Sequence, residues 1–147
     1  MRSDFPLPDV DWPPTAPFWA AAAEGRFELP RCRSCGRLCW YPKESCSYCG
    51  DAALSWEPVA GRARLFSWVV VRNVFLPQYR EKVPYVTGLV SLEEDPSVRL
   101  VTEVVDTDVD SGGLEFDQPM EVVFRPLRFA GVEGTVTAPL WRPLVKT

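Results

Sequence analysis

Four cysteines in two CxxC pairs are the residues of this chain whose types and spacing best suit chemistry. Cys32 and Cys35 form the first pair, Cys46 and Cys49 form the second, and ten residues separate the pairs. Each short loop presents two thiolates, and two such loops complete a tetrahedron around Zn²⁺. The spacing therefore predicts a zinc ribbon whose metal ligands are these four cysteines.

The alternatives to zinc are four free thiols or two disulfides. Adjacent CxxC disulfides are usually redox-active, and neither pair has the βαβ surroundings of a redox motif. Gly36 and Gly50 directly follow the second cysteine of each pair, where the backbone must turn tightly under a metal at positive φ. These features favour zinc.

The predicted zinc site is closed, because four thiolates leave no coordination position for water or substrate. The chain contains no histidine, the residue that most often moves protons at neutral pH. We therefore expect a structural zinc ion and no catalytic residue. Metal binding, worth about 10 kcal/mol or more in zinc-finger peptides, should supply most of the ribbon's folding energy. Cys39 is left over, and its CWYP setting favours a small buried apolar residue or a bystander near the metal over a nucleophile.

Length and composition predict a cytoplasmic protein without membrane contact. A chain of 147 residues, 46% hydrophobic and 24% charged, has room for a small metal module attached to one compact domain. No apolar run approaches the ~20 residues of a membrane span, and residues 1–17 lack a basic-then-apolar signal peptide. Such a location keeps thiols reduced and available to zinc.

Net charge and aromatic content indicate which class of partner the chain contacts. The net charge is −4 and the pI is near 4.9, which argues against nucleic acid because its binders gain most of their affinity by neutralising phosphates. Six tryptophans and 12% aromatic residues exceed the needs of a core this size. Some rings should therefore contact another protein or a ligand.

Composition and periodicity divide the chain into four parts. They are an extended proline-rich arm without a fold of its own (1–14), an N-terminal helix (15–26), the zinc ribbon (27–53) and an OB-fold barrel (54–147). Thr15 and Pro17 predict the helix start, with the threonine hydroxyl as its cap, and Gly25 predicts its end. The helix either covers the ribbon or docks a partner. Within the ribbon we expect strands at 27–31 and 38–41.

Period-two alternation predicts five further strands after the ribbon. Their expected bounds are 62–73, 85–93, 98–106, 120–125 and 136–141. Five strands in about ninety residues most economically form a small Greek-key barrel of the OB type, whereas a sandwich usually needs about seven. The predicted fold class is therefore mainly β, with a short N-terminal helix, a zinc ribbon and a five-stranded OB-fold barrel.

The first barrel strand and the loop after it carry an unusual mixture of rings and cations. Strict alternation places Ala63, Leu65, Ser67, Val69 and Val71 inside the barrel, and Arg62, Arg64, Phe66, Trp68, Val70 and Arg72 outside. The long loop 74–83 adds more rings and cations, and such loops are usually functional. Three roles are open for this surface: packing on the zinc module, docking a partner or acyl carrier, or stacking against nucleic-acid bases. The candidate residues for a partner or acyl-CoA surface are Phe18, Trp19, Phe66, Trp68, Arg72, Phe75, Tyr79, Arg80 and Lys82.

An acidic stretch at 106–117 imitates a calcium loop, with Asp106, Asp108 and Asp110 at alternate positions. Two positions that a calcium-binding loop requires do not match: Ser111 stands at the position of the required glycine, and Asp117 stands at the position of the required glutamate. We therefore expect a solvated connection between strands.

The order of these parts resembles one known family. An N-terminal helix (PFWAAAAEGRF), a rubredoxin-like ribbon (CRSCGRLCWYPKESCSYCG) and a barrel with the strands VPYVTGLVSLEE and PMEVVFRPL follow one another. This combination is similar to the acyl-CoA-associated zinc-ribbon/OB-fold family called domain of unknown function thirty-five. The resemblance covers nearly the whole chain from Ala16 on and is more specific than either part alone.

The resemblance implies an accessory role. Members of that family are usually non-catalytic small subunits of thiolase-like enzymes, which are thiolases, acyltransferases or retro-aldolases acting on acyl-CoA, including in sterol side-chain breakdown. It implies a hetero-oligomer, such as a heterotetramer, with acyl-CoA at or near the interface and catalysis in the partner. Arg72, Arg80 and Lys82 are candidates to face CoA phosphates. The alternative is an OB-fold module that binds single-stranded nucleic acid.

Overall fold

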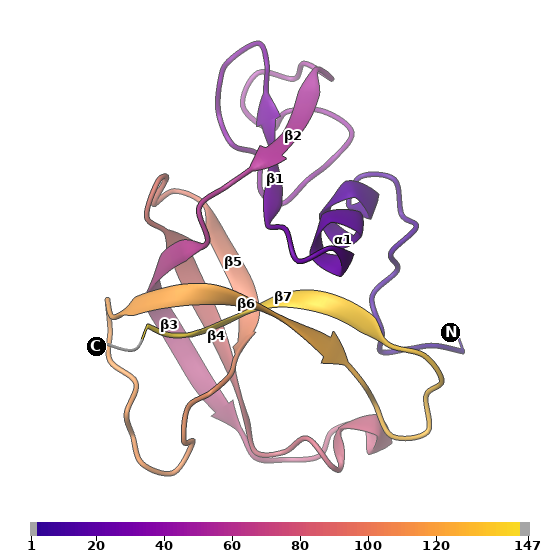
Figure 1. Cartoon of the computed structure of the whole chain (residues 1–147), viewed down its shortest axis with the longest axis vertical. Coiled ribbons are helices and arrows are strands. Elements are labelled where there is room, and N and C mark those ends of the chain that lie inside the picture. Colours follow the sequence, from indigo (N-terminus) through magenta and orange to yellow (C-terminus); the bar gives the residue numbers. More distant parts are fainter. Residues whose placement is uncertain (1–2, 145–147) are drawn as a thin grey trace.

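The structure of the chain is a computed structural model that describes residues 3–144 (Figure 1). A ribbon hairpin stands above a β-barrel, and a short helix lies beside the hairpin. The elements in chain order are α1 (Ala16–Ala23), β1 (Glu28–Cys32), β2 (Leu54–Pro58), β3 (Arg62–Val71), the 3-10 helix η1 (Pro77–Tyr79), β4 (Tyr85–Leu92), β5 (Arg99–Val104), β6 (Pro119–Leu127) and β7 (Val136–Pro143). Within residues 3–144, no helix has the length and apolar character needed to cross a bilayer.

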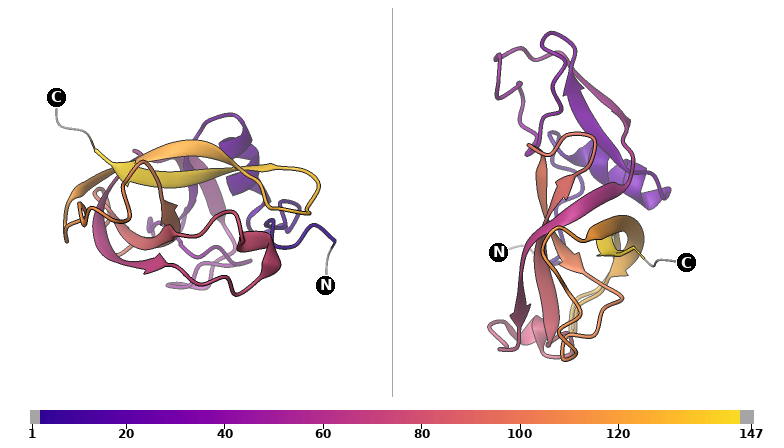
Figure 2. Two further views of the ribbon diagram at one scale, coloured as in Figure 1. Left: turned by 90° about the horizontal axis from the view of Figure 1, so that it is seen from below. Right: turned by 90° about the vertical axis from the view of Figure 1, so that its left-hand side faces the viewer.

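Five strands close into a barrel in the order β3-β4-β5-β7-β6 (Figures 1 and 2). Neighbouring strands are antiparallel except β5 and β7, which meet in parallel at a single residue pair, Val104 and Trp141. Alternate residues of each strand point inward, and Trp141 is the largest of the fully buried side chains. The closed five-stranded barrel confirms the predicted OB fold.

The strict alternation expected along β3 is wrong beyond Leu65. The β3–β4 register shifts between Leu65 and Ser67, as at a β-bulge, where an extra residue turns the following side chains to the other face. Ala63 and Leu65 are fully buried as expected, whereas Val69 is 59% exposed. Trp68 packs against the barrel core, so its ring lies on the inner face instead of the outer surface that we expected.

The second strand of the ribbon is β2, which pairs with β1 along its whole length. The predicted strand at 38–41 is wrong, because the only strand pairing in that segment is an isolated bridge from Leu38 to Arg31. The backbone N–H of Cys39 donates to the carbonyl of Pro30 at 2.8 Å. Residues 38–41 are therefore a loop held against β1, and Pro42 prevents them from extending a ladder.

The base of the ribbon belongs to the same apolar core as the barrel. Phe27, Leu29 and Leu38 are buried in one cluster with the barrel residue Trp141. The rings of Phe27 and Trp141 meet edge to face with their centroids 5.5 Å apart. Burial of this kind stabilises both parts at once, so ribbon and barrel are not independent at their junction.

The N-terminal helix forms at the expected place, with Pro17 in its first turn and Gly25, at φ +74°, just past its end. The expected cap is wrong, since Thr15 is the N-cap residue but its hydroxyl makes no capping hydrogen bond. Its φ of −117° and ψ of −5° lie outside the extended region that positions a capping side chain. The helix packs against β7 and β1 (Figure 1).

The described part of the proline-rich arm is folded onto the rest of the molecule. Its backbone turns at Asp4 and Leu7, whose N–H donates to the Asp4 carbonyl at 2.8 Å, and Leu7 is only 7% exposed. The described part of the arm is therefore a series of turns packed on the rest of the molecule and not the extended segment that we expected. Residues 1–2 lie outside the described residues.

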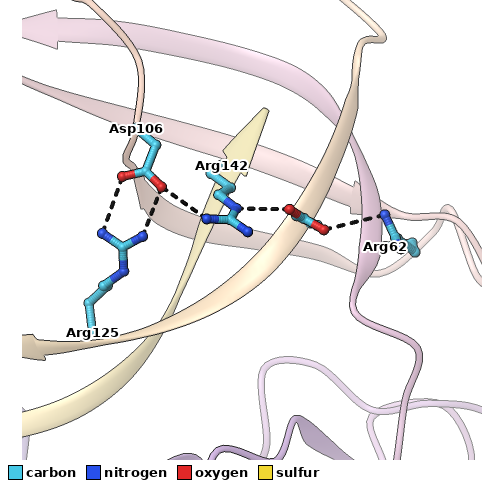
Figure 3. A network of polar contacts seen from close by, with 5 residues as sticks. Arg62, Asp106, Arg125 and Arg142 are labelled. Atoms are coloured by element: carbon cyan, nitrogen blue, oxygen red, sulfur yellow. Dashed lines mark hydrogen bonds and ion pairs between the residues drawn. The ribbon is translucent and has the colours of Figure 1, made fainter. Parts of the chain in front are cut away.

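Five charged side chains form a continuous network on the barrel wall (Figure 3). Asp106, just after β5, pairs with Arg125 of β6 at 2.8 Å and with Arg142 of β7 at 3.2 Å. Arg142 also pairs with Glu121 of β6 at 2.8 Å, and Glu121 reaches Arg62 of β3 at 3.5 Å. The network therefore bridges the β5–β7 seam, where strand pairing is reduced to one residue pair.

Candidate metal centre and aromatic cavity

Two matching turns present the four predicted metal ligands. In the first, the N–H of Gly36 donates to the carbonyl of Cys32 at 2.8 Å, and in the second the N–H of Gly50 donates to the carbonyl of Cys46 at 2.9 Å. The two glycines have φ values of +78° and +80°, a conformation that strains any residue with a side chain. Both turns therefore depend on glycine, as the sequence predicts.

The four sulfur atoms fit a tetrahedral zinc ion. The Sγ atoms of Cys32, Cys35, Cys46 and Cys49 all lie within 4.8 Å of one another. Two of the separations are 3.5 Å (Cys32 to Cys49) and 3.7 Å (Cys35 to Cys46). A tetrahedron with Zn–S bonds of about 2.3 Å has edges of roughly 3.8 Å. The four cysteines are thus positioned to hold a structural zinc ion, which would cross-link the two turns.

Backbone amides prepare the buried ligand Cys46 to act as a thiolate. Burial alone raises the pKa of this thiol, but N–H donors from Cys49 and Tyr48 lower its pKa to about 6. The Tyr48 N–H lies 3.3 Å from the sulfur. For Cys32, the N–H of Cys35 is the main cause that lowers the pKa of the thiol. Deprotonated thiols are what a metal requires.

Cys39 is a fifth thiol in contact with this site. It is only 3% exposed, and its Sγ lies 3.5 Å from the Sγ of Cys46. Burial raises the pKa of Cys39 to about 11, so this thiol stays protonated at neutral pH. These observations confirm the prediction of a small buried residue near the metal.

A cavity of about 360 Å³ opens where arm, helix, ribbon and barrel meet, beside the β5–β7 seam. Nine aromatic residues line it, half of those in the chain. They are Phe18, Trp19, Phe27, Trp40, Tyr41, Tyr79, Tyr85, Phe129 and Trp141. The volume and a lining made mostly of aromatic and aliphatic side chains are typical of small-molecule sites.

The polar groups of this cavity gather near η1. The ammonium of Lys82 lies 4.6 Å from the ring centre of Phe129, and Tyr79 stacks on Tyr85 with ring centroids 5.6 Å apart. Burial raises the pKa of Tyr79, so its hydroxyl stays protonated. Glu103 is the acidic residue of the lining, and within residues 3–144 neither Lys82 nor Glu103 makes an ion pair. The cavity thus has an aromatic end at the helix and a polar end at η1.

The nine predicted surface residues do not form one surface. Phe18, Trp19, Tyr79 and Lys82 meet at the cavity, where Phe18 is buried and the other three are half-buried. Trp68 faces the barrel interior. The remaining four, Phe66, Arg72, Phe75 and Arg80, are exposed on β3 or the loop after it, and Phe75 is 78% exposed.

Sequence reasoning missed several residues of both regions. Trp40 and Tyr41 form a wall of the cavity, and their position as paired rings directly before Pro42 in the ribbon was an available signal. Phe116 is 68% exposed and its ring meets Phe66 at 6.1 Å. Phe116 lies within the acidic stretch 106–117, where a lone ring among acidic and glycine residues was an available signal.

Comparisons with known proteins agree with this architecture. The family described as "ChsH2, rubredoxin-like zinc ribbon domain" matches residues 19–55, and "ChsH2, C-terminal OB-fold domain" matches residues 56–125. A DUF35 domain-containing scaffold protein of Methanothermobacter thermautotrophicus is 30% identical over 108 residues, which are 73% of this chain and 77% of that protein. A protein of the same description from Pyrococcus furiosus is 27% identical over 114 residues, 76% of this chain and 79% of that protein.

Two solved structures share the fold. A chain of the "Ltp2-ChsH2(DUF35) aldolase" superposes with a TM-score of 0.77 at 27% identity, over 94% of this chain and 100% of that chain. A DUF35 protein of Sulfolobus solfataricus superposes with a TM-score of 0.55 at 14% identity, over 76% of this chain and 78% of that chain. The cysteine turns, the closed barrel and the relatives together show that this chain belongs to the DUF35 family of zinc-ribbon/OB-fold proteins.

Proposed function

We propose that this chain is a non-catalytic accessory subunit of a thiolase-like enzyme that acts on acyl-CoA. The observation that carries the proposal is the match to the Ltp2-ChsH2(DUF35) aldolase, which spans the whole of that chain. Relatives named scaffold proteins support the same role. The accessory subunit stabilises its partner in a hetero-oligomer, and the partner supplies the groups that make or break the carbon–carbon bond.

The chemistry available in this chain supports a scaffold role. The four sulfurs that fit the zinc ion complete its tetrahedron, so the metal has no open position at which to activate water or polarise a carbonyl. The sequence contains no histidine to act as a general base. The zinc ion instead holds the ribbon in shape on top of the barrel.

Exposed apolar side chains on the barrel offer a docking surface for the partner. Phe75 and Val101 are 78% and 76% exposed, and Phe66 and Phe116 form an exposed aromatic pair. The guanidinium of Arg99 lies 4.1 Å from the ring centre of Phe66. Large exposed rings beside arginine are typical of interface anchors.

The aromatic cavity is the part of the chain best suited to contact an acyl group. Its aromatic end takes apolar surface, and Lys82 and Glu103 provide polar contacts at the other end. Among the predicted cations, Arg72 already pairs with Asp110 at 3.2 Å. Arg80 makes no ion pair within residues 3–144, so we propose Arg80 and Lys82 as the contacts to CoA phosphates. A sterol-derived acyl chain in the cytoplasm is the substrate that the family resemblance implies.

Co-expression with a thiolase-like protein from the same source tests this proposal. We expect one hetero-oligomeric peak in size-exclusion chromatography with light scattering, and acyl-CoA turnover only when both proteins are present. Phe75→Ser should weaken the complex at least tenfold without changing the fold. Tyr48→Ser, at an exposed ring on the ribbon (50% exposed), is the matched control. Two separate peaks with a fully active partner, or turnover by this chain alone, would overturn the proposal.

A further inference from the structure

Cys46 has a sulfur neighbour, Cys39, that is not one of the four metal ligands. The Sγ of the exposed ligand Cys35 lies 3.7 Å from the Sγ of Cys46. The Sγ of the buried fifth thiol, Cys39, lies 3.5 Å from the same atom. The sulfur atoms therefore form a contact path from the surface at Cys35, through Cys46, to the interior at Cys39.

We propose that Cys39 is a resolving thiol, so that mild oxidation of the ribbon by a peroxide ends in a Cys39–Cys46 disulfide. The proposal is independent of the accessory role. It makes residues 39 and 46 a reversible modification site whose co-reactant is hydrogen peroxide or another two-electron peroxide oxidant. Thiols that are poised next to a second thiol are the ones that oxidise reversibly.

The reaction balances in three steps. Peroxide oxidises the exposed Cys35 sulfur to a sulfenic acid and is itself reduced to hydroxide. The Cys46 thiolate attacks that sulfur, a Cys35–Cys46 disulfide forms, and a second hydroxide leaves. Cys39 gives its proton to hydroxide and attacks the Cys46 sulfur, which releases Cys35 as a thiolate. Written for thiols, two thiols and one hydrogen peroxide give one disulfide and two waters.

The Cys39–Cys46 disulfide removes fewer metal ligands than the Cys35–Cys46 disulfide that it replaces. A Cys35–Cys46 bond takes two of the four sulfurs from the metal position, whereas a Cys39–Cys46 bond takes one and leaves Cys32, Cys35 and Cys49. Three protein ligands suffice to hold zinc in many sites. Cys39 therefore protects the ribbon from losing its metal when the exposed ligands meet an oxidant.

The position of Cys39 also links this chemistry to the cavity. The next residue, Trp40, is a wall of the cavity and its ring centroid lies 4.9 Å from that of Phe18 in α1. The backbone of Cys39 is held to β1 by its hydrogen bond to Pro30. Loss of zinc would free this loop, so the resolving thiol also preserves the shape of the cavity.

The test uses the full-length, zinc-loaded protein and one equivalent of hydrogen peroxide. Disulfides are mapped by mass spectrometry after free thiols are alkylated, and released zinc is measured with a chromogenic chelator. We expect Cys39–Cys46 to be the main disulfide in the wild type. Cys39→Ala should release at least threefold more zinc per equivalent of peroxide and should form Cys35–Cys46 or Cys32–Cys49 instead. Dithiothreitol should restore four alkylatable ligands in the wild type.

Cys39→Ser is the matched second variant, because it keeps a small polar side chain but cannot exchange with a disulfide. It should behave like Cys39→Ala. The proposal is overturned if Cys39 remains reduced in the wild type while the ligands form disulfides. Equal zinc release from wild type and either variant also overturns it. If neither variant folds, the disulfide map of the wild type alone decides.

Discussion

The metal end of the ribbon and the barrel are held together by different forces. Around the metal, the buried cluster consists of Cys32, Cys39 and Cys46, with Leu54 packed against it. The main cluster contains fifteen buried residues from the barrel, the helix and the ribbon's base. One region relies on a few bonds to an ion, and the other relies on distributed apolar burial.

This difference predicts how each region fails. Loss of one ligand should weaken zinc binding and remove a large part of the stabilisation at the metal end, since each of the four ligands bonds directly to the ion. Loss of one core side chain should cost the barrel only part of its stability. The two regions share a junction at Phe27 and Trp141. Variants far from this junction should therefore distinguish the metal end from the barrel best.

The largest effect should follow Cys49→Ala, which removes a metal ligand far from the junction. We expect zinc affinity to fall sharply, so that the metal end loses much of the stabilisation of about 10 kcal/mol or more that the ion provides. Amide exchange should accelerate in residues 32–54 while β3 to β7 stay protected. Cys39→Ala under reducing conditions is the control, and it should keep one zinc per chain. A Cys49→Ala protein whose barrel unfolds with the ribbon would break the comparison.

The next effect concerns the junction itself. Trp141→Ala removes the largest fully buried side chain and should destabilise the protein by about 3–5 kcal/mol, as measured by urea unfolding. Both regions should respond, because Phe27 loses its ring partner. Trp12→Ala, at a ring that is 46% exposed, should stay within about 0.5 kcal/mol of the wild type. A loss confined to the barrel would show that the junction does not couple the two regions.

Overpacking tests the barrel alone. A Cβ at Gly88 would meet Val104 Cγ2 at 2.6 Å, and extra atoms in a packed core typically cost about 1–3 kcal/mol. Gly88→Ala should therefore lower the urea midpoint without changing zinc content. Adding Val104→Ala to Gly88→Ala should relieve the clash, so the two changes should not be additive. Gly113→Ala, where an added Cβ would make only an ordinary contact with Ser111 Oγ at 3.6 Å, is the control, and an equal loss there would refute the packing argument.

The sequence predicted the parts of this molecule that depend on local patterns. Cysteine spacing located the metal ligands, and period-two alternation located all five barrel strands to within a few residues. These signals suffice because each depends on residues close together in the chain. The order of these parts along the chain then led to the family resemblance, which the relatives confirm.

The parts that escaped prediction depend on distant contacts. β2 pairs with β1, and the two strands lie on either side of both cysteine turns in the sequence. The alternation of residues along β2 cannot reveal which strand it pairs with. The bulge after Leu65 turned the Trp68 side chain to the inner face. The sequence did not predict this change, because one extra residue in a strand leaves no mark in composition. The cavity assembles residues from the arm to β7, so no single stretch of sequence contains it.

The smallest effect should come from the ion-pair network at the barrel seam. Hydrogen bonds from Arg125 hold the pKa of Asp106 below its ordinary value of 3.8, and Arg142 adds to this. A carboxyl with a lowered folded-state pKa stabilises the protein above its unfolded-state pKa and loses that contribution as pH falls through the folded-state pKa. Since the Asp106 side chain is 39% exposed, screening limits its contribution to about 0.5–1 kcal/mol.

Asp106→Asn should therefore lower stability at pH 7 by this small amount, and the gap to the wild type should close as the pH falls below about 4. Urea midpoints at pH 7, 4 and 2.5 measure the gap, which should also shrink in high salt. Glu133→Gln, at an exposed residue that makes no ion pair within residues 3–144, should show no such pH dependence. A gap that persists at pH 2.5 would mean that Asp106 stabilises the seam through hydrogen bonds that do not need its charge. Its positive-φ backbone would not explain such a gap, since asparagine also adopts that conformation at little cost.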